Sequence, residues 1–187
     1  MDRIDLVSHR VVLDAPRSDD IADITRYCQD PVFEHTLTLP WPYGRSDADH
    51  FVNEFVPRGW SIGDEFTWAI RIEPGGPLLG VIGLRAPDSD IGYWLGAEHR
   101  GHGHMTEAVR LVADWAFDSA GAGLAEIGWE CVTGNTSSAA VARRSGFRFA
   151  GEGPSRIPFR HGRHPPSWHG TLRAGDDRSP RKGWPAW

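Results

Sequence analysis

The chain has 187 residues, of which 40% are hydrophobic and 24% are charged, and its formal net charge is −5. This length and composition are typical of one folded domain with a full hydrophobic core, and they exclude a disordered chain. The negative net charge and the lack of a long basic run argue against non-specific binding to nucleic acid.

The sequence carries no sign of export or of membrane insertion. Its two cysteines, Cys28 and Cys131, are too few for a disulfide framework. No apolar run approaches the roughly 20 residues of a membrane span, and the N-terminal segment does not have the shape of a signal peptide. We therefore expect a cytoplasmic protein that does not bind membranes.

Hydrophobic periodicity and turn residues define the elements of the first half of the chain. The pattern predicts a strand at 7–13, a helix that begins near Ser18, a stiff loop at 40–44, a helix that begins at Ser46, and strands at 66–72 and 78–84. Two prolines restrict the loop at 40–44, and the segment from Ser46 is similar to a capping box. Glycines and prolines at 73–77 indicate a hairpin connection.

The second half alternates strands and helices. The pattern predicts a strand at 90–95, a glycine-rich turn, a helix that ends near Ser119, a strand at 125–132, a helix at 135–145, and strands near 148–151 and 168–173. Gly146 follows the second helix, as is common where a helix ends in a left-handed residue. Residues 175–187 are polar and contain Gly and Pro, so we expect a loosely held tail after a single domain at 1–174.

The glycine-rich turn has the sequence Arg100-Gly101-His102-Gly103-His104-Met105-Thr106-Glu107. The first turn of a helix has N–H groups without partners and the positive end of the helix dipole, so it attracts phosphate. Glycines let the backbone approach a ligand closely, and Arg100 adds a positive charge. The segment therefore predicts a phosphate-binding site.

The spacing within this segment selects the phosphate ligand. No Lys follows the glycines as in a Walker loop, and Thr106 stands where a dinucleotide fingerprint has its third glycine. The pattern Arg-x-x-Gly-x-Gly/Ala, with Arg100, Gly103 and Met105 at the named positions, resembles the coenzyme A pyrophosphate loop of the GNAT N-acetyltransferases. The longer string resembles their RimJ/RimL-like branch, and Met105 departs from the usual Gly or Ala. The resemblance implies that acetyl-CoA is bound by Arg100, Gly101, His102, Gly103, His104, Met105 and Thr106.

A second segment carries the same resemblance. Asn135 and Ser138 begin a helix that ends at Gly146-Phe147, which is similar to the Asn-x-x-Ser and Gly-Phe pattern of the family. An Asn side chain offers both a donor and an acceptor to the amides of the pantetheine arm. Ser138 can donate a hydrogen bond to the departing sulfur. Both residues are also favoured as helix caps, which is the alternative interpretation.

The order of the predicted elements resembles the GNAT arrangement from about Val7 to Arg173. It implies an α/β (α+β) fold with a mixed sheet of about six or seven strands and about four flanking helices. The parallel strands at 90–95 and 127–132 are expected to splay apart. A backbone N–H near Leu95 is then the candidate that polarises the acetyl carbonyl in the gap.

Acetyl transfer to an amine needs a base for the ammonium group. Glu130 ends its strand and Asp90 begins the preceding one, and both match positions where GNAT enzymes carry the base. A histidine and water-mediated deprotonation are the alternatives left open. The tyrosine acid of some relatives has no match, because Ala142 stands at that position. Ser138 is the candidate acid in its place.

The first two helices, their loop and the last hairpin are expected to form the acceptor side. The candidate walls of this cleft are Trp41, Tyr43, Phe159 and Trp168, with peripheral core as the equal alternative for each. The segment 160–166 is basic where the branch carries acidic residues, so the resemblance does not carry over the substrate preference. His99, His102 and His104 have a spacing that suits a metal, but no Cys or carboxylate completes a set, and we predict no metal site.

Together these features predict an acetyl-CoA-dependent N-acetyltransferase that transfers the acetyl group directly to an amine. The amine is the N-terminal α-amine of a protein or peptide, or that of a small molecule. The alternative is a coenzyme A-binding module without transferase activity, a sensor or interaction protein. A nucleotide-binding protein is disfavoured by the missing Lys-Ser/Thr pair. The sequence identifies neither the acceptor nor the oligomeric state, and a homodimer is one of the states left open.

Overall fold

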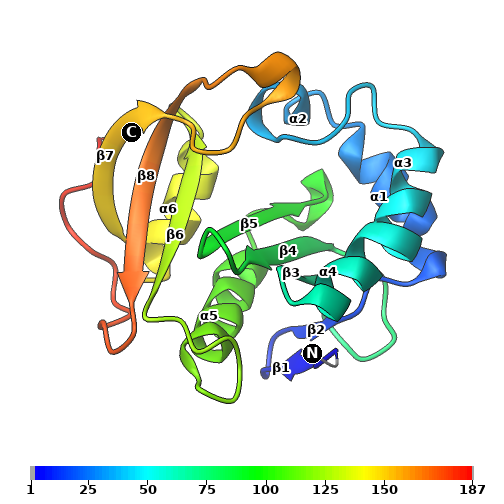
Figure 1. Ribbon diagram of the computed structural model, residues 1–187, viewed down its shortest axis with the longest axis horizontal. Helices are drawn as coiled ribbons and strands as arrows, with labels where there is room; N and C mark the ends of the chain where they lie inside the picture. Colours follow the sequence, from blue (N-terminus) through cyan, green and yellow to red (C-terminus); the bar gives the residue numbers. More distant parts are fainter. Residues whose placement is uncertain (1–2, 187) are drawn as a thin grey trace.

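In the computed structural model, which describes residues 3–186, eight strands form one mixed sheet with helices on both of its faces (Figure 1). The strands lie in the order β1-β2-β3-β4-β5-β6-β8-β7. Their bounds are Leu6–Val7 (β1), Val12–Asp14 (β2), Glu65–Arg71 (β3), Gly80–Arg85 (β4), Asp90–Leu95 (β5), Glu126–Val132 (β6), Arg148–Pro154 (β7) and Pro166–Arg173 (β8).

The helices follow the order predicted from the periodicity. Their bounds are Ile21–Cys28 (α1), Phe33–Thr36 (α2), Arg45–His50 (α3), Val56–Ile62 (α4), His104–Phe117 (α5) and Thr136–Arg144 (α6). A π-helical turn at Phe51–Phe55 joins α3 to α4 in one continuous segment, and short 3-10 turns lie at Ser18–Asp20, Ala97–His99 and Arg160–Gly162. The short helix α2 was not predicted.

The first predicted strand is wrong in one respect, because residues 7–13 form a hairpin and not a single strand. The Ser8 hydroxyl oxygen accepts hydrogen bonds from the N–H groups of Arg10 (3.1 Å) and Val11 (3.3 Å), so the chain turns between β1 and β2. Hydrogen bonds from backbone N–H groups to a serine side chain stabilise a turn and compete with an extended strand. The hairpin raises the number of strands in the sheet to eight.

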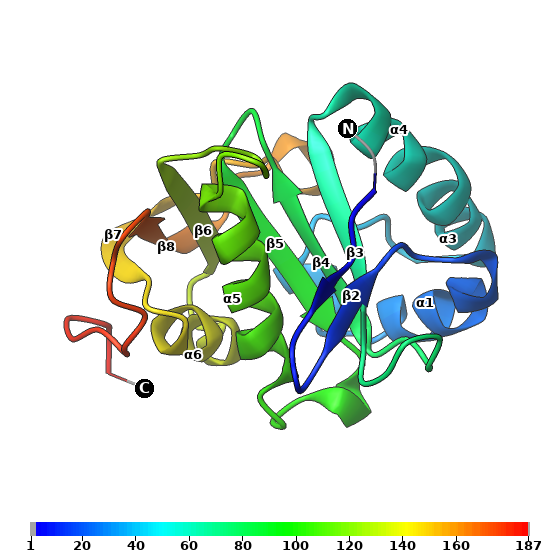
Figure 2. The same cartoon turned by 90° about the horizontal axis from the view of Figure 1, so that it is seen from below.

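The central strands bury both faces. Trp68 and Ile82 belong to the cluster that contains the apolar side of α5, whereas Ala69 and Val81 belong to the cluster that contains α1 and α3. Alternation along a strand places these neighbouring residues on opposite faces. Figure 2 shows α5 and α6 in front of the sheet, with α1 and α3 away from them. The buried residues of α4, Val56 and Trp60, belong to the cluster that contains α5. The central strands are therefore covered by helices on both faces.

The parallel strands β5 and β6 pair over only a short length. Asp90 lies opposite Gly128 and Ile91 opposite Trp129, and no further pair forms although both strands continue. The sheet thus opens between β5 and β6 (Figure 1). The predicted splay of these two strands is confirmed.

The C-terminal segment contacts the domain. Arg178 forms an ion pair of 2.9 Å with Asp114 of α5, and the Trp184 ring lies 5.5 Å from the ring of Trp129, centroid to centroid. These contacts involve part of the segment that we expected to be loosely held. Within residues 3–186 no helix is both long enough and apolar enough to cross a membrane.

Candidate active site

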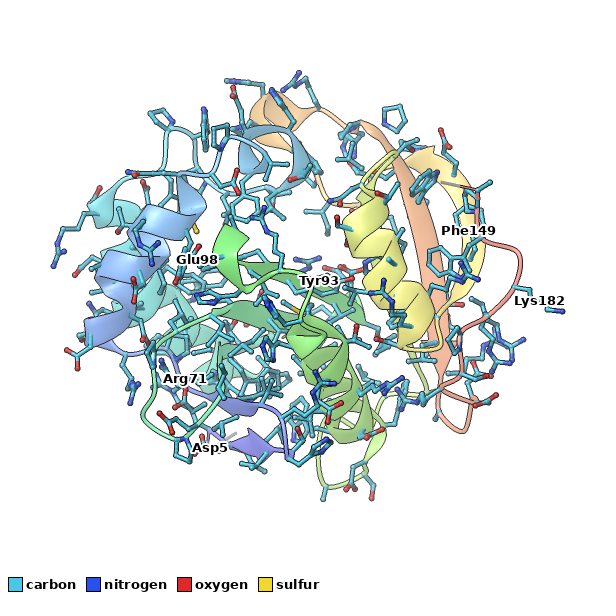
Figure 3. All side chains as sticks on the ribbon, turned by 180° about the vertical axis from the view of Figure 1, so that it is seen from behind. Asp5, Arg71, Tyr93, Glu98, Phe149 and Lys182 are labelled. Carbon is cyan, nitrogen blue, oxygen red and sulfur yellow. The ribbon has the colours of Figure 1, made fainter. Side chains whose placement is uncertain are left out.

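A cavity of about 520 Å³ lies where β5 and β6 diverge. Its walls come from α2, β5, the glycine-rich loop, β6, α6 and the connection between β7 and β8. Figure 3 shows Tyr93 of β5 at this opening, beside α6. The cavity brings together the two segments that the sequence singled out, although about thirty residues of chain separate them.

The glycine-rich loop presents the N-terminus of α5 to this cavity. Gly101 and Gly103 have φ values of 81° and 83°, a region that non-glycine residues rarely adopt. The first bond within the helix runs from the Glu107 N–H to the Gly103 carbonyl, at 3.2 Å. The N–H groups of residues 104–106 therefore have no partner inside the helix, as an anion site requires.

Two arginines approach the loop in different ways. Arg10, from the β1–β2 turn, donates to the His102 carbonyl at 2.8 Å, and a Cβ atom on Gly103 would lie 3.3 Å from its guanidinium. Arg100 folds back to donate to the Leu95 carbonyl and pairs with Asp30 at 2.8 Å. Arg10 thus adds a positive charge that the sequence did not indicate, whereas the charge of Arg100 is shared with Asp30.

Two buried polar atoms in the first turn of α5 have no partner within the described part of the chain. They are His104 Nδ1 and Thr106 Oγ1. Burial, aided by His102 and Arg10, lowers the pKa of the His104 imidazole, so the ring is neutral near neutral pH. Buried polar groups without hydrogen bonds are rare and are often completed by a ligand. The loop therefore fits the phosphates of the expected coenzyme.

The edge of β5 supplies further N–H groups. The Gly96 N–H donates to the Leu79 carbonyl at 2.9 Å, on the side of β4. Because successive residues of an antiparallel strand point their N–H groups to opposite sides, those of Leu95 and Tyr93 face the gap. The predicted N–H of Leu95 is thus available, and Tyr93 adds a second one nearer to the point of divergence.

Ser138 lies at the same place, on the first turn of α6. Its N–H donates to the Asn135 side-chain oxygen at 3.2 Å, so Asn135 caps the helix as the alternative interpretation held. The Ser138 hydroxyl accepts from the Trp129 indole at 3.2 Å and donates to the Tyr93 hydroxyl at 3.3 Å. Sequence reasoning missed Tyr93, because nothing in a half-buried strand reveals a partner 45 residues away.

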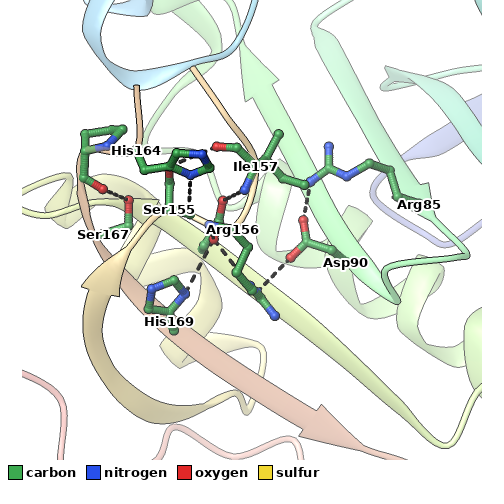
Figure 4. A network of polar contacts seen from close by, with 10 residues as sticks. Arg85, Asp90, Ser155, Arg156, Ile157, His164, Ser167 and His169 are labelled. Atoms are coloured by element: carbon green, nitrogen blue, oxygen red, sulfur yellow. Dashed lines mark hydrogen bonds and ion pairs between the residues drawn. The ribbon is translucent and has the colours of Figure 1, made fainter. Parts of the chain in front are cut away.

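Glu130 lines the cavity, but its carboxylate is already occupied as an acceptor. It accepts hydrogen bonds from the N–H groups of Arg156 (2.9 Å) and Ile157 (3.2 Å) and from the Arg156 guanidinium (3.3 Å). His169 Nδ1 lies 3.4 Å away. These contacts, visible around Arg156 and His169 in Figure 4, fix the start of the β7–β8 connection against β6.

Asp90, the second candidate base, lies in the same network (Figure 4). It pairs with Arg85 and, at 3.0 Å, with Arg156, whose guanidinium occupies the space that a side chain at Gly128 would fill. Burial nevertheless raises the pKa of Asp90 to about 6, against the opposing effect of the two arginines. Arg156 therefore joins both candidate carboxylates.

We expect Asp90 to titrate in the folded protein near pH 6. Because this folded pKa lies above the ordinary value of 3.8, the contribution of Asp90 to stability is fully present below pH 3.8 and is lost as the pH rises through about 6. Carboxyl-carbon NMR measures the midpoint, and Asp90→Asn should remove this component from the pH dependence of the unfolding free energy. A midpoint at or below the ordinary value contradicts the expectation.

The four residues proposed as walls of the acceptor cleft do not line one common cavity. Phe159 lines the first cavity, and the buried Tyr43 lines a second cavity of about 390 Å³ that adjoins it. Trp41 and Trp168 line neither of these two. The Trp168 indole is buried and donates to Glu152 at 3.1 Å, as expected of a core residue.

The histidines do not converge on one point. His99 Nε2 lies 2.7 Å from the Tyr27 hydroxyl, whereas the rings of His102 and His104 stack on each other with centroids 5.8 Å apart. Among residues 3–186, no group of three or more His, Cys, Asp and Glu side chains is placed to hold a metal ion.

Comparisons with known proteins agree with this geometry. A family model described as an acetyltransferase (GNAT) domain matches residues 10–148, which is more than half of the chain. No curated protein matches the sequence.

Solved structures share the fold. A RimL ribosomal L7/L12 alpha-N-protein acetyltransferase in complex with coenzyme A has a TM-score of 0.76 and 17% identity, over 93% of this chain and 100% of that one. RimJ of Mycobacterium smegmatis in complex with CoA-disulfide has a TM-score of 0.74 and 19% identity, over 92% and 87%. The ribosomal-protein-S5-alanine acetyltransferase of Vibrio fischeri has a TM-score of 0.72 and 19% identity, over 95% and 100%.

Proposed function

Since this chain belongs to the GNAT family of acetyltransferases, we propose that it transfers the acetyl group of acetyl-CoA directly to a primary amine. The amine is the α-amine of a protein N-terminus or that of a small molecule. Two of the three structures above are ribosomal-protein acetyltransferases, which supports the protein N-terminus. The family match favours a transferase over the alternative of a coenzyme-binding module. The cytoplasmic location stays a prediction, and a homodimer stays one of the oligomeric states left open.

One observation carries the proposal: the free N–H groups at the start of α5 and the gap-facing N–H groups of β5 line one cavity. Residues 103–106 would hold the pyrophosphate, with Arg10 as an added cation and with Thr106 as a further donor. Arg144, at the end of α6, also lines the cavity and can meet a further phosphate. When bound, acetyl-CoA supplies a thioester whose carbonyl carbon accepts the amine.

The chain then supplies groups that polarise the acetyl carbonyl and a proton for the departing sulfur. The N–H groups of Leu95 and Tyr93 face the gap and can stabilise a developing oxyanion. Ser138 and Tyr93 place two hydroxyl groups together at the side of α6, where a departing sulfur needs a proton. Burial raises the pKa of the Tyr93 phenol, so it stays a proton donor at physiological pH.

Turnover with a panel of acceptors tests the proposal. The purified protein is incubated with acetyl-CoA and with hexapeptides that begin with Ser, Ala or Phe, or with small amines, and products are identified by mass spectrometry. We expect acetylation of an amine nitrogen. Binding of acetyl-CoA in calorimetry without any product would instead establish the coenzyme-binding module.

A further inference from the structure

Two glycines leave space on one face of the sheet, next to the coenzyme cavity. Gly83 of β4 lies directly opposite Gly92 of β5, and both line the second cavity of about 390 Å³. A Cβ atom at Gly83 would lie 3.3 Å from a Glu65 carboxylate oxygen and 3.6 Å from the Thr67 hydroxyl. The absence of side chains thus opens a depression whose edge is polar.

The polar edge has unused hydrogen-bonding capacity. Thr67 is 2% exposed, and its hydroxyl has no partner within the described residues. The half-buried Glu65 carboxylate has no hydrogen bond or ion pair in the same part of the chain. A buried hydroxyl and a carboxylate that lack partners are best completed by a cationic donor.

The charges around this edge favour a cation. Arg85 pairs with Asp90, and Arg156 pairs with Asp90 and Glu130. Arg85 lies directly opposite Glu65 in the register of β3 and β4, but its ion pair is with Asp90, so Glu65 is the carboxylate of this group without an ion pair. A primary ammonium at Glu65 would supply the missing positive charge and up to three donors.

Much of the remaining lining of the cavity is apolar. It includes Leu37, Leu39, Tyr43, Phe51 and Phe55. Phe51 and Phe55 come from the π-helical turn, and their rings stack with centroids 5.8 Å apart. Phe55 is 42% exposed, so its ring is accessible to a group bound in the cavity. This volume and lining suit an aromatic or large aliphatic group.

We propose that the second cavity is the acceptor site, that it takes a primary ammonium bearing a bulky apolar group, and that Glu65 binds this ammonium and accepts its proton. The inference rests on the acetyl transfer proposed above. The cavity shares Gly92, Tyr93 and Trp94 with the coenzyme cavity, so an amine above Gly92 lies beside the gap-facing N–H of Tyr93.

The proton balance follows from this placement. The ammonium gives one proton to Glu65, and the free amine forms a bond to the acetyl carbon as the carbon–sulfur bond breaks. The second proton of the nitrogen passes through the hydroxyl groups of Ser138 and Tyr93 to the departing sulfur, and Glu65 afterwards releases its proton to solvent. Burial raises the pKa of Glu65, against the effect of Arg85, which suits a group that must receive a proton. The other charged or titratable groups around this cavity are Tyr43, Asp47, His50, Asp64, Asp88, Asp90 and Tyr93.

Glu65→Gln is the direct test, because it keeps the shape of the side chain and removes its charge. Calorimetry of the protein saturated with coenzyme A should show that the affinity for phenethylamine falls by about 10-fold or more, since an ammonium loses its counter-charge. The affinity for acetyl-CoA should stay within about twofold. Glu126→Gln, a strand carboxylate that pairs with Arg173 at the surface, is the matched control and should change neither affinity.

Turnover adds a readout that separates the two proposals. In wild type we expect kcat/KM for phenethylamine, or for the hexapeptide beginning with Phe, to exceed that for ethylamine or the hexapeptide beginning with Ser. Comparing phenethylamine with the hexapeptide beginning with Phe shows whether the acceptor is a free amine or a peptide. Glu65→Gln should lower kcat by about 100-fold and remove the acidic limb of its pH profile.

Each outcome has one meaning. Equal binding of phenethylamine by wild type and Glu65→Gln, or loss of the acidic limb in Glu130→Gln but not in Glu65→Gln, overturns the assignment of Glu65. Binding that depends on Glu65 without any acetyl transfer would keep the ammonium site and reject the proposed function.

Discussion

Gly103→Glu should lower the affinity for acetyl-CoA by about 100-fold or more, which corresponds to about 2.7 kcal/mol. Gly103 caps α5 with a φ of 83°, and a Cβ atom there would lie 3.3 Å from the Arg10 guanidinium. The new carboxylate would pair with Arg10 or with the free N–H groups of residues 104–106. Either contact places a negative charge where the pyrophosphate is proposed to bind.

Calorimetry with acetyl-CoA measures the loss, and Gly123→Glu is the control. Gly123 has a φ of 63° and open space around its Cβ position, and it lies between α5 and β6, outside both cavities. It therefore brings a comparable backbone strain and the same charge without touching the loop. If both variants bind acetyl-CoA as wild type does, the phosphate site is not at residues 100–106.

The elements that sequence predicted well are those specified by nearby residues. The helix after Gly103 shows its apolar positions at helical spacing, and the helix after Asn135 has a cap at one end and Gly146 at the other. The glycine-rich loop is also local, since its conformation depends on two glycines within four residues. The prediction of the fold and of the coenzyme loop was based on these segments.

The parts that sequence did not reveal depend on contacts between distant segments. Arg10 reaches His102 across 92 residues, and Arg156 joins Asp90 and Glu130 from the β7–β8 connection. No periodicity marks such partners. The same limit applies to Glu130, which stays a candidate base: its position at the end of a strand is visible in the sequence, whereas the N–H groups that its carboxylate accepts from are not.

Glu65 is a residue that sequence reasoning did not single out. In sequence it is one charged residue at the edge of a predicted strand, with a solvated surface as its ordinary interpretation. Its unusual position arises because Gly83 and Gly92, from two other strands, leave space beside it. Glu65 borders a cavity because two residues on the neighbouring strands have no side chains. The register of β3, β4 and β5 is needed to see that these residues lie close to it.

Ser138→Ala should lower kcat by about 100-fold and leave the affinity for acetyl-CoA within a few-fold, since general acids contribute roughly 100- to 10,000-fold. The Ser138 hydroxyl lies between the Trp129 indole and the Tyr93 hydroxyl, at 3.2 Å and 3.3 Å. Tyr93→Phe keeps the ring and removes the second hydroxyl, so it should lower kcat by a similar factor. Steady-state kinetics give both effects, and Ser119→Ala, in the turn after α5, is the control.

The double variant decides whether the two hydroxyl groups act as one unit. Residues that share a proton path are not additive, so Ser138→Ala with Tyr93→Phe should cost little more than either change alone. Two independent losses would multiply instead, and they would mean that one hydroxyl donates the proton while the other only packs against the coenzyme. Wild-type kcat in both single variants and in the double variant would move the acid away from Ser138 and Tyr93, the two hydroxyl groups that meet where β5 leaves β6.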